Sequence, residues 1–148
     1  MECSALSAYG KNSKLAAYQS VSVHGGVSGA DPHGLVLMLM DGALERLCLA
    51  RSCLERGEIA RKAQLLHSCV TVITELRGSL NLAQGGELAH NLSSLYEYMM
   101  RQLLRANVEN NQELIREVIG LLGEIRGAWV AIGPEVRQPM APAAGPKP

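Results

Sequence analysis

The chain is short of aromatic side chains: of its 148 residues none is phenylalanine and one is tryptophan. Hydrophobic residues nevertheless make up 47% of the sequence, so aliphatic side chains must fill the core. Because β-sandwiches draw more heavily on aromatic and β-branched residues, this composition favours an all-helical protein. A chain of this length is one domain's worth.

Charge of one sign and long hydrophobic runs are also lacking. The formal net charge is zero and no run of lysine and arginine exceeds two residues, so we expect no nucleic-acid partner. The longest apolar run, residues 35–40, is far shorter than the ~20 residues that span a bilayer, so we expect no membrane insertion. The N-terminus lacks the layout of a signal peptide, which predicts a cytoplasmic location in the cytosol.

Motifs for catalysis and metal binding are few. The four cysteines are not spaced like a zinc framework, and no Walker loop or dinucleotide fingerprint is present. Glu87 and His90 form a single Glu-x-x-His motif, but di-iron bundles carry this motif on two helices, and both side chains are predicted to face water. His33 is predicted to be a surface or cap residue. We therefore expect that the protein is not an enzyme and that it has no catalytic, cofactor or metal site.

Helix signals divide the chain into an arm, a bundle and a tail. Residues 1–31 are predicted as a loose N-terminal arm or cap, and residues 134–148 as a disordered, proline-rich tail. Between them, the single domain of residues 32–133 contains four helical patterns, which cover residues 32–56, 58–82, 85–107 and 110–132. Short connections between them predict an all-α, antiparallel up-down four-helix bundle with an N-terminal capping arm or short helix.

Local signals mark the ends of these helices. Asp31 is a candidate N-cap, and Pro32 follows at the first helical position, where its missing N–H costs nothing. Gly57 is predicted to end the first helix in a left-handed conformation, and a double glycine interrupts the chain before the third. Asn110 with Glu113 is predicted to form a capping box for the fourth helix.

Each helix has one apolar stripe that is predicted to face the core on a wheel of 100° per residue. The stripes comprise Val36, Leu39, Ala43, Leu47, Ala50 and Leu54; Ile59, Ala63, Leu66, Val70 and Ile73; Leu88, Leu92, Leu95, Met99, Leu103 and Ala106; and Leu114, Val118, Leu121, Leu122, Ile125, Trp129 and Ile132. On solvated faces two i,i+4 ion pairs are predicted, Glu58 with Lys62 and Glu97 with Arg101.

The first three helices carry more apolar surface than the core stripes need. The residues of these outer stripes are Leu35, Met38, Leu49 and Cys53; Leu65, Val72 and Leu76; and Tyr96, Met100 and Leu104. A soluble monomer seldom leaves such a surface uncovered. We expect it to be covered by the N-terminal arm, by a second copy or by a partner helix, unless the stripes simply belong to a thicker core.

Several separate stretches resemble the FliS family, the export chaperones of bacterial flagellin. The stretches are Tyr18-x-x-Val21-x-Val23, Ala30-Asp31-Pro32-His33, Met38-Leu39-x-Asp41-Gly42-Ala43, residues 85–107, Ile119-Gly120-Leu121-Leu122 and Ala128-Trp129. The resemblance implies a cytosolic chaperone that binds the disordered C-terminal segment of flagellin, prevents its premature polymerisation and assists its delivery to the flagellar type III export gate. It also implies an arm that caps the bundle through Leu15, Tyr18 and Val21.

The predicted partner-binding residues therefore combine two sources. The arm residues come from the resemblance, and eight outer-stripe residues come from the helical periodicity: Leu35, Met38, Leu49, Leu65, Val72, Tyr96, Met100 and Leu104. The alternative hypothesis is a self-associating helical adaptor with a different helical partner, and a homodimer of the free protein is left open by the sequence. Met40 stands where the family commonly has an aromatic residue, and its place near the core stripe predicts that it packs inside.

Overall fold

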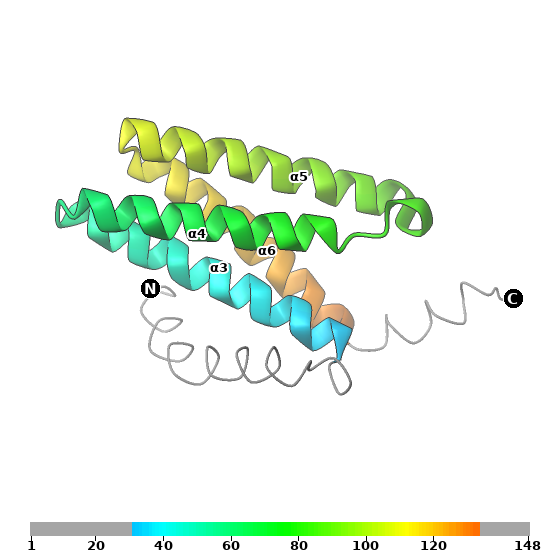
Figure 1. Cartoon of the computed structure of the whole chain (residues 1–148). Helices are drawn as coiled ribbons and strands as arrows, with labels where there is room; N and C mark the ends of the chain where they lie inside the picture. Colours follow the sequence, from blue (N-terminus) through cyan, green and yellow to red (C-terminus); the bar gives the residue numbers. More distant parts are fainter. Residues whose placement is uncertain (1–30, 134–148) are drawn as a thin grey trace, which may run out of the picture.

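The computed structural model describes residues 31–133, which form four α-helices with no strand among them. The helices are α3 (Pro32–Glu55), α4 (Ile59–Gly78), α5 (Leu82–Glu109) and α6 (Gln112–Ile132). Consecutive helices pack on each other, and α6 also packs on α3, so the bundle closes (Figure 1). The prediction of an all-α helical bundle is confirmed.

The ends of α3 follow the local signals in the sequence. Asp31 is the N-cap, and its Oδ1 accepts a hydrogen bond from the backbone N–H of His33 at 3.2 Å. Pro32 occupies the first helical position, as predicted. Two residues after the last residue of α3, Gly57 has a φ of 78°, which a residue with a side chain rarely adopts. Local chemistry therefore sets both ends of this helix.

Of two further predicted boundaries, the break at the double glycine is confirmed and the cap at Asn110 is wrong by one residue. The double glycine kinks α5, because Gly86 has a non-helical φ of 59° and ψ of −139°. The cap of α6 is Asn111 and not Asn110: the Asn111 side chain accepts from the N–H of Glu113 at 2.9 Å. Asn110 instead takes the left-handed turn position with a φ of 53°, which asparagine tolerates better than most residues.

All four helices contribute to the core, which is almost entirely aliphatic. Tyr96 is its one aromatic residue among the described positions, and Met40 packs inside as predicted, with 1% of its surface exposed. The buried cluster consists of Met40, Ala43, Leu44, Leu47, Ala50, Leu66, Cys69, Ile73, Leu76, Tyr96, Met99, Leu103, Ala106, Ile115, Val118 and Leu122.

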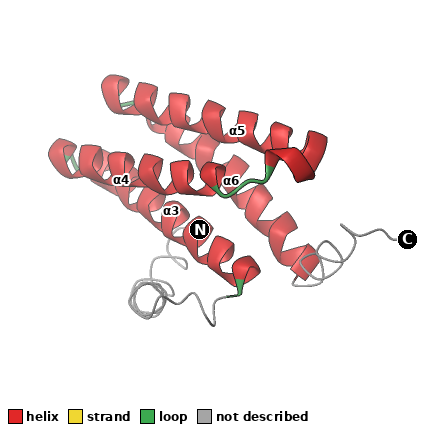
Figure 2. Ribbon diagram, turned by 45° about the vertical axis from the view of Figure 1, so that its right-hand side comes forward, coloured by secondary structure: helices red, strands yellow, loops and turns green. Residues whose placement is uncertain are grey.

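Three residues predicted for the core are exposed. Leu88 lies just after the kink in α5, Ile59 begins α4 and Ile132 ends α6, and they are 69%, 44% and 38% exposed. Leu88 points along the core stripe, but α6 crosses obliquely and diverges from the N-terminal part of α5 (Figures 1 and 2), so no helix covers it. Conversely, Cys53 and Leu76 were predicted for the outer surface and are 1% exposed. A wheel gives the direction of a side chain but not the neighbour that it meets.

Neither predicted i,i+4 ion pair occurs among the described residues. Glu58 pairs with Arg56, whose Nη2 lies 3.0 Å from its Oε1, and Glu97 pairs with Arg77 of α4. Lys62 was predicted to be solvated but is 1% exposed. The predicted arm up to residue 30, with Leu15, Tyr18 and Val21, and the predicted tail lie outside the described residues.

Candidate partner-binding surface

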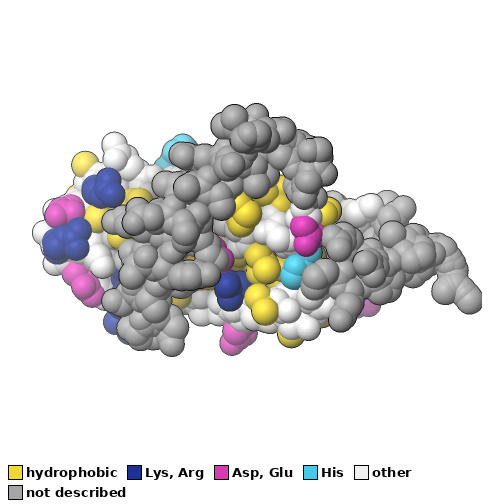
Figure 3. Space-filling view, turned by 90° about the horizontal axis from the view of Figure 1, so that it is seen from below, with side chains coloured by type: hydrophobic (Ala, Val, Ile, Leu, Met, Phe, Trp, Pro, Cys, Tyr) yellow, Lys and Arg dark blue, Asp and Glu magenta, His cyan; other side chains and the backbone are white. Residues whose placement is uncertain are grey.

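The outer residues of α3 and of one side of α4 lie along the junction between these helices. Arg46 of α3 fixes which sides meet, because its Nε donates to Ser68 Oγ of α4 at 2.8 Å. On the wheel, the predicted contact residues fall on the same outer side of the junction, and all of them are half-buried: Leu35, Met38 and Leu49 on α3, and Leu65 and Val72 on α4. Hydrophobic side chains are also visible from below, the side on which α3 lies (Figure 3).

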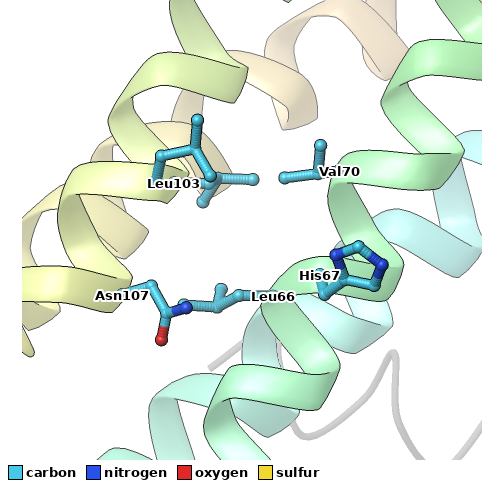
Figure 4. A pocket seen from close by; sticks show the side chains of 6 residues that line it. Leu66, His67, Val70, Leu103 and Asn107 are labelled. Atoms are coloured by element: carbon cyan, nitrogen blue, oxygen red, sulfur yellow. The ribbon is translucent and has the colours of Figure 1, made fainter.

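The opposite side of α4 forms a small pocket with α5. Its volume is about 60 Å³, several times the space that one water molecule needs. Leu66 and Leu103 are fully buried at its base, while Leu104 is 59% exposed at its rim. Val70 and Leu103 point toward one another across it (Figure 4). The pocket is lined by Leu66, His67, Val70, Leu103, Leu104 and Asn107.

A buried lysine ties α4 to α5 at one end of this pocket. Lys62 Nζ donates to the backbone oxygen of Asn107 at 3.0 Å and to its Oδ1 at 2.6 Å. The ammonium group thereby lies at the C-terminal turn of α5, where carbonyl groups without a partner in the helix attract positive charge. Burial lowers the pKa of Lys62, because removal from water disfavours the charged form.

The other end of the same junction is tied by polar side chains near the surface. Arg77 Nε donates to Ser93 Oγ at 3.1 Å, and Arg77 also pairs with Glu97. Thr74 Oγ1 lies 3.3 Å from Met100 Sδ, although its shorter hydrogen bond, of 2.8 Å, goes to the Val70 carbonyl. The two helices are thus held together on both sides of the apolar pocket. What remains open between these ties is a short groove with an aliphatic lining.

The predicted α5 residues lie at different depths along this junction. Leu104 is at the rim and Met100 is half-buried beside it. Tyr96 is 2% exposed, and burial raises the pKa of its hydroxyl to about 12. It therefore packs in the core beneath the surface of the junction. The outer residues therefore form two surfaces, one on each side of α4, and not a single stripe.

Some residues of the junction were not predicted as parts of a site. Val70 was predicted for the core, and Lys62 was predicted to pair with Glu58 and not with Asn107. Their spacing contains no signal for the pocket, since Lys62 and Asn107 are 45 residues apart and meet only when α4 lies against α5. Only the apolar residues Leu104 and Met100, on the outer stripe of the third predicted helix, predicted this surface.

The junction of α3 with α6 is held by an aromatic stack, hydrogen bonds and an ion pair. The rings of His33 and Trp129 stack with centroids 4.9 Å apart and an interplanar angle of 13°. His33 Nε2 lies 2.8 Å from the Trp129 carbonyl oxygen, and Trp129 Nε1 donates to the His33 carbonyl at 3.0 Å. Arg126 pairs with the buried carboxylate of Asp41. The prediction of His33 as a surface residue is wrong, since it is 6% exposed.

The described residues contain neither a metal-binding cluster nor a membrane-spanning helix. Across residues 31–133, no group of three or more His, Cys, Asp and Glu side chains could hold a metal ion. Glu87 and His90 are both exposed, and His90 Nδ1 lies 2.9 Å from the carbonyl oxygen of Gly86. Within the described residues, no helix has the length and apolarity that crossing a membrane requires.

The fold and surface define a class: a four-helix bundle with half-buried and exposed aliphatic side chains on its described outer surface. The family described as "Flagellar protein FliS" matches residues 14–136, so the chain belongs to the FliS family. The protein is 44% identical over 124 residues to the flagellar secretion chaperone FliS of Salmonella typhimurium, covering 83% of this chain and 92% of the relative.

Two other relatives agree with this assignment. The flagellar secretion chaperone FliSB of Pseudomonas aeruginosa is 45% identical over 115 residues, which are 78% of this chain and 91% of the relative. The flagellar secretion chaperone FliS of Vibrio cholerae is 38% identical over 131 residues, which are 88% and 96%. The family is thus one of flagellar secretion chaperones, which is not an enzyme class.

Proposed function

We propose that this protein is a cytosolic export chaperone that binds the disordered C-terminal segment of flagellin, prevents its premature polymerisation and assists its delivery to the flagellar type III export gate. The observation that carries the proposal is the similarity, over most of the chain, to relatives named flagellar secretion chaperones. An exposed aliphatic rim beside a pocket gives such a client a place to bind.

The physical argument rests on what a disordered amphipathic segment gains on this surface. Such a segment loses conformational entropy when it becomes ordered, so it must bury substantial apolar area in return. The pocket between α4 and α5 can receive an aliphatic side chain beside Leu104. The half-buried residues of α3 and α4 extend the apolar area to the other side of α4.

The N-terminal arm has a part in the same proposal. We expect Leu15, Tyr18 and Val21 to cover apolar surface of the bundle while flagellin is absent and to move when it binds. Deletion of residues 1–23 should then increase the fluorescence of a dye that binds exposed hydrophobic surface. An unchanged dye signal in the folded, truncated protein would contradict this role of the arm.

The test of client binding uses two exposed leucines of α5. Leu104 lies at the pocket and is 59% exposed, whereas Leu88 is 69% exposed and lies outside the predicted surface. With a peptide covering the last ~40 residues of flagellin, Leu104→Asp should weaken binding by on the order of tenfold or more, because it places a charge against apolar groups. Leu88→Asp is the matched control and should bind like the unchanged protein.

Two results would count against the proposal. Equal loss of affinity in both variants would mean that the pocket between α4 and α5 is not the contact. No binding by the unchanged protein, together with a dimer that persists in the presence of the peptide, would favour the self-associating adaptor. A chaperone should instead form a one-to-one complex with its client.

A further inference from the structure

The C-terminal half of α6, residues 123–132, is anchored differently from the rest of the bundle. In α3, α4 and α5 the last buried residues are Cys53, Leu76 and Ala106, all within one turn of the helix end. In α6 the last buried residue is Leu122, although the helix continues to Ile132. Beyond Leu122, α6 contributes only half-buried and exposed side chains to the described structure.

Glycines weaken the middle and the C-terminal half of α6 as a helix: Gly120 lies just before the segment, and Gly123 and Gly127 lie within it. Gly120, Gly123 and Gly127 lie on the outward face of the wheel, and a Cβ added at any of them would meet nothing within 4 Å among the described residues. At Gly42 of α3, by contrast, a Cβ would come within 2.9 Å of Arg46 Nη1. Packing of the described chain therefore does not require the α6 glycines, and each lowers helix propensity relative to alanine.

Polar and ring contacts to the N-terminal half of α3 hold this segment in place, together with the partly buried side chains of Ile125 and Trp129, which pack against the edge of the core. Arg126 pairs with Asp41, and its own side chain is one-third exposed. Trp129 stacks on His33 and exchanges hydrogen bonds with it. Contacts of this kind can be replaced by contacts with water more readily than a buried aliphatic layer, so they favour opening without unfolding of the whole bundle.

We propose that residues 123–132 form a releasable segment that separates from α3 and loses its helical hydrogen bonds as a unit. The hinge lies at Gly123, directly after the buried Leu122, and the first half of α6 stays docked through Ile115, Val118 and Leu122. Opening breaks the Asp41–Arg126 pair and the His33–Trp129 stack, and it uncovers the side of α3 around His33. This conformational switch belongs to the free protein and does not depend on which client it binds.

The test is amide hydrogen exchange of the full-length chain with two matched variants. Gly127→Ala lies in the releasable segment and Gly120→Ala in the docked half, and both glycines have open space outward. Amides of residues 124–132 should exchange at least tenfold faster than those of residues 115–122. Gly127→Ala should slow the exchange of residues 124–132 by about fivefold, as the propensity difference predicts.

Gly120→Ala decides between local and global opening. If the segment opens by itself, this variant leaves the exchange of residues 124–132 unchanged and slows only that of residues 115–122. Equal protection along the whole of α6, or equal slowing of both halves by both variants, would overturn the proposal. Either of those results would mean that α6 opens only when the entire bundle unfolds.

Discussion

Two junctions of the bundle, α4 with α5 and α3 with α6, are both tied by polar side chains but leave different surfaces behind. Between α4 and α5 the ties lie at the two ends, at Lys62 and at Arg77, and an apolar pocket stays open between them. Between α3 and α6 the largest side chain, Trp129, is itself part of the tie. The position of the polar contacts thus decides where aliphatic surface remains available to a partner.

The largest expected effect comes from breaking the first junction at Lys62. Lys62→Ala leaves the Asn107 oxygens without their donor and creates a cavity, which should reduce the free energy of unfolding by about 3 kcal/mol. Lys62→Met retains most of the volume and removes a buried charge, so its loss should be smaller, about 1 kcal/mol. Urea denaturation of both variants measures the difference. A loss below 0.5 kcal/mol in the alanine variant would contradict a structural role for this lysine.

The next largest expected effect is a pH dependence of stability that comes from the same junction. Burial raises the pKa of Tyr96 to about 12 from its ordinary value of 10.0. Below pH 10 the tyrosine is neutral in both the folded and the unfolded states; between pH 10 and 12 the unfolded state loses its proton first. Stability should therefore fall over this range by about 2–3 kcal/mol through Tyr96.

Denaturation at pH 9 and pH 11.5 tests this expectation. Tyr96→Phe should lose less stability than the unchanged protein as the pH rises. Tyr98→Phe is the comparison: the hydrogen bond that Tyr98 donates to Glu117 raises its pKa as well, so this variant should also lose less stability, through a hydrogen bond and not through burial. The remaining alkaline titrations are common to all three proteins. An identical alkaline loss in Tyr96→Phe and the unchanged protein would show that Tyr96 is hydrated in solution.

The smallest expected effect comes from a substitution at the junction of α3 with α6. Trp129→Phe keeps an aromatic ring against His33 but removes the N–H that donates to the His33 carbonyl. The expected loss is about 1 kcal/mol, the usual net value of one hydrogen bond. Urea denaturation followed by circular dichroism measures it, because this substitution removes the one tryptophan of the chain. A gain in stability would mean that the stack and its hydrogen bonds do not hold α6 to α3.

Features that depend on neighbouring residues in the chain could be predicted from the sequence. The cap at Asp31, the terminator at Gly57 and the break at the double glycine all form as expected, because each acts within one turn. The helix periodicity also gave the four helices and most of the core. The cap at Asn111 differs by one residue, since two adjacent asparagines offer the same chemistry.

Features that depend on which helices meet could not be predicted in this way. Leu88 lies on the core stripe but is exposed, because α6 diverges from that end of α5. Lys62 has the spacing of a solvated ion pair with Glu58, yet it turns toward Asn107. In the candidate site, the shoulder at Leu104 was predicted and the pocket beside it was not, because a pocket requires two helices to be placed.

The most direct test of the central claim is a calorimetric titration of the full-length protein with the C-terminal segment of flagellin, with the mass of the complex measured in parallel. Tight one-to-one binding with a negative heat-capacity change is the predicted result, because the client buries the outer aliphatic surface. The absence of binding heat at several temperatures, with the protein remaining a stable dimer, would contradict the claim.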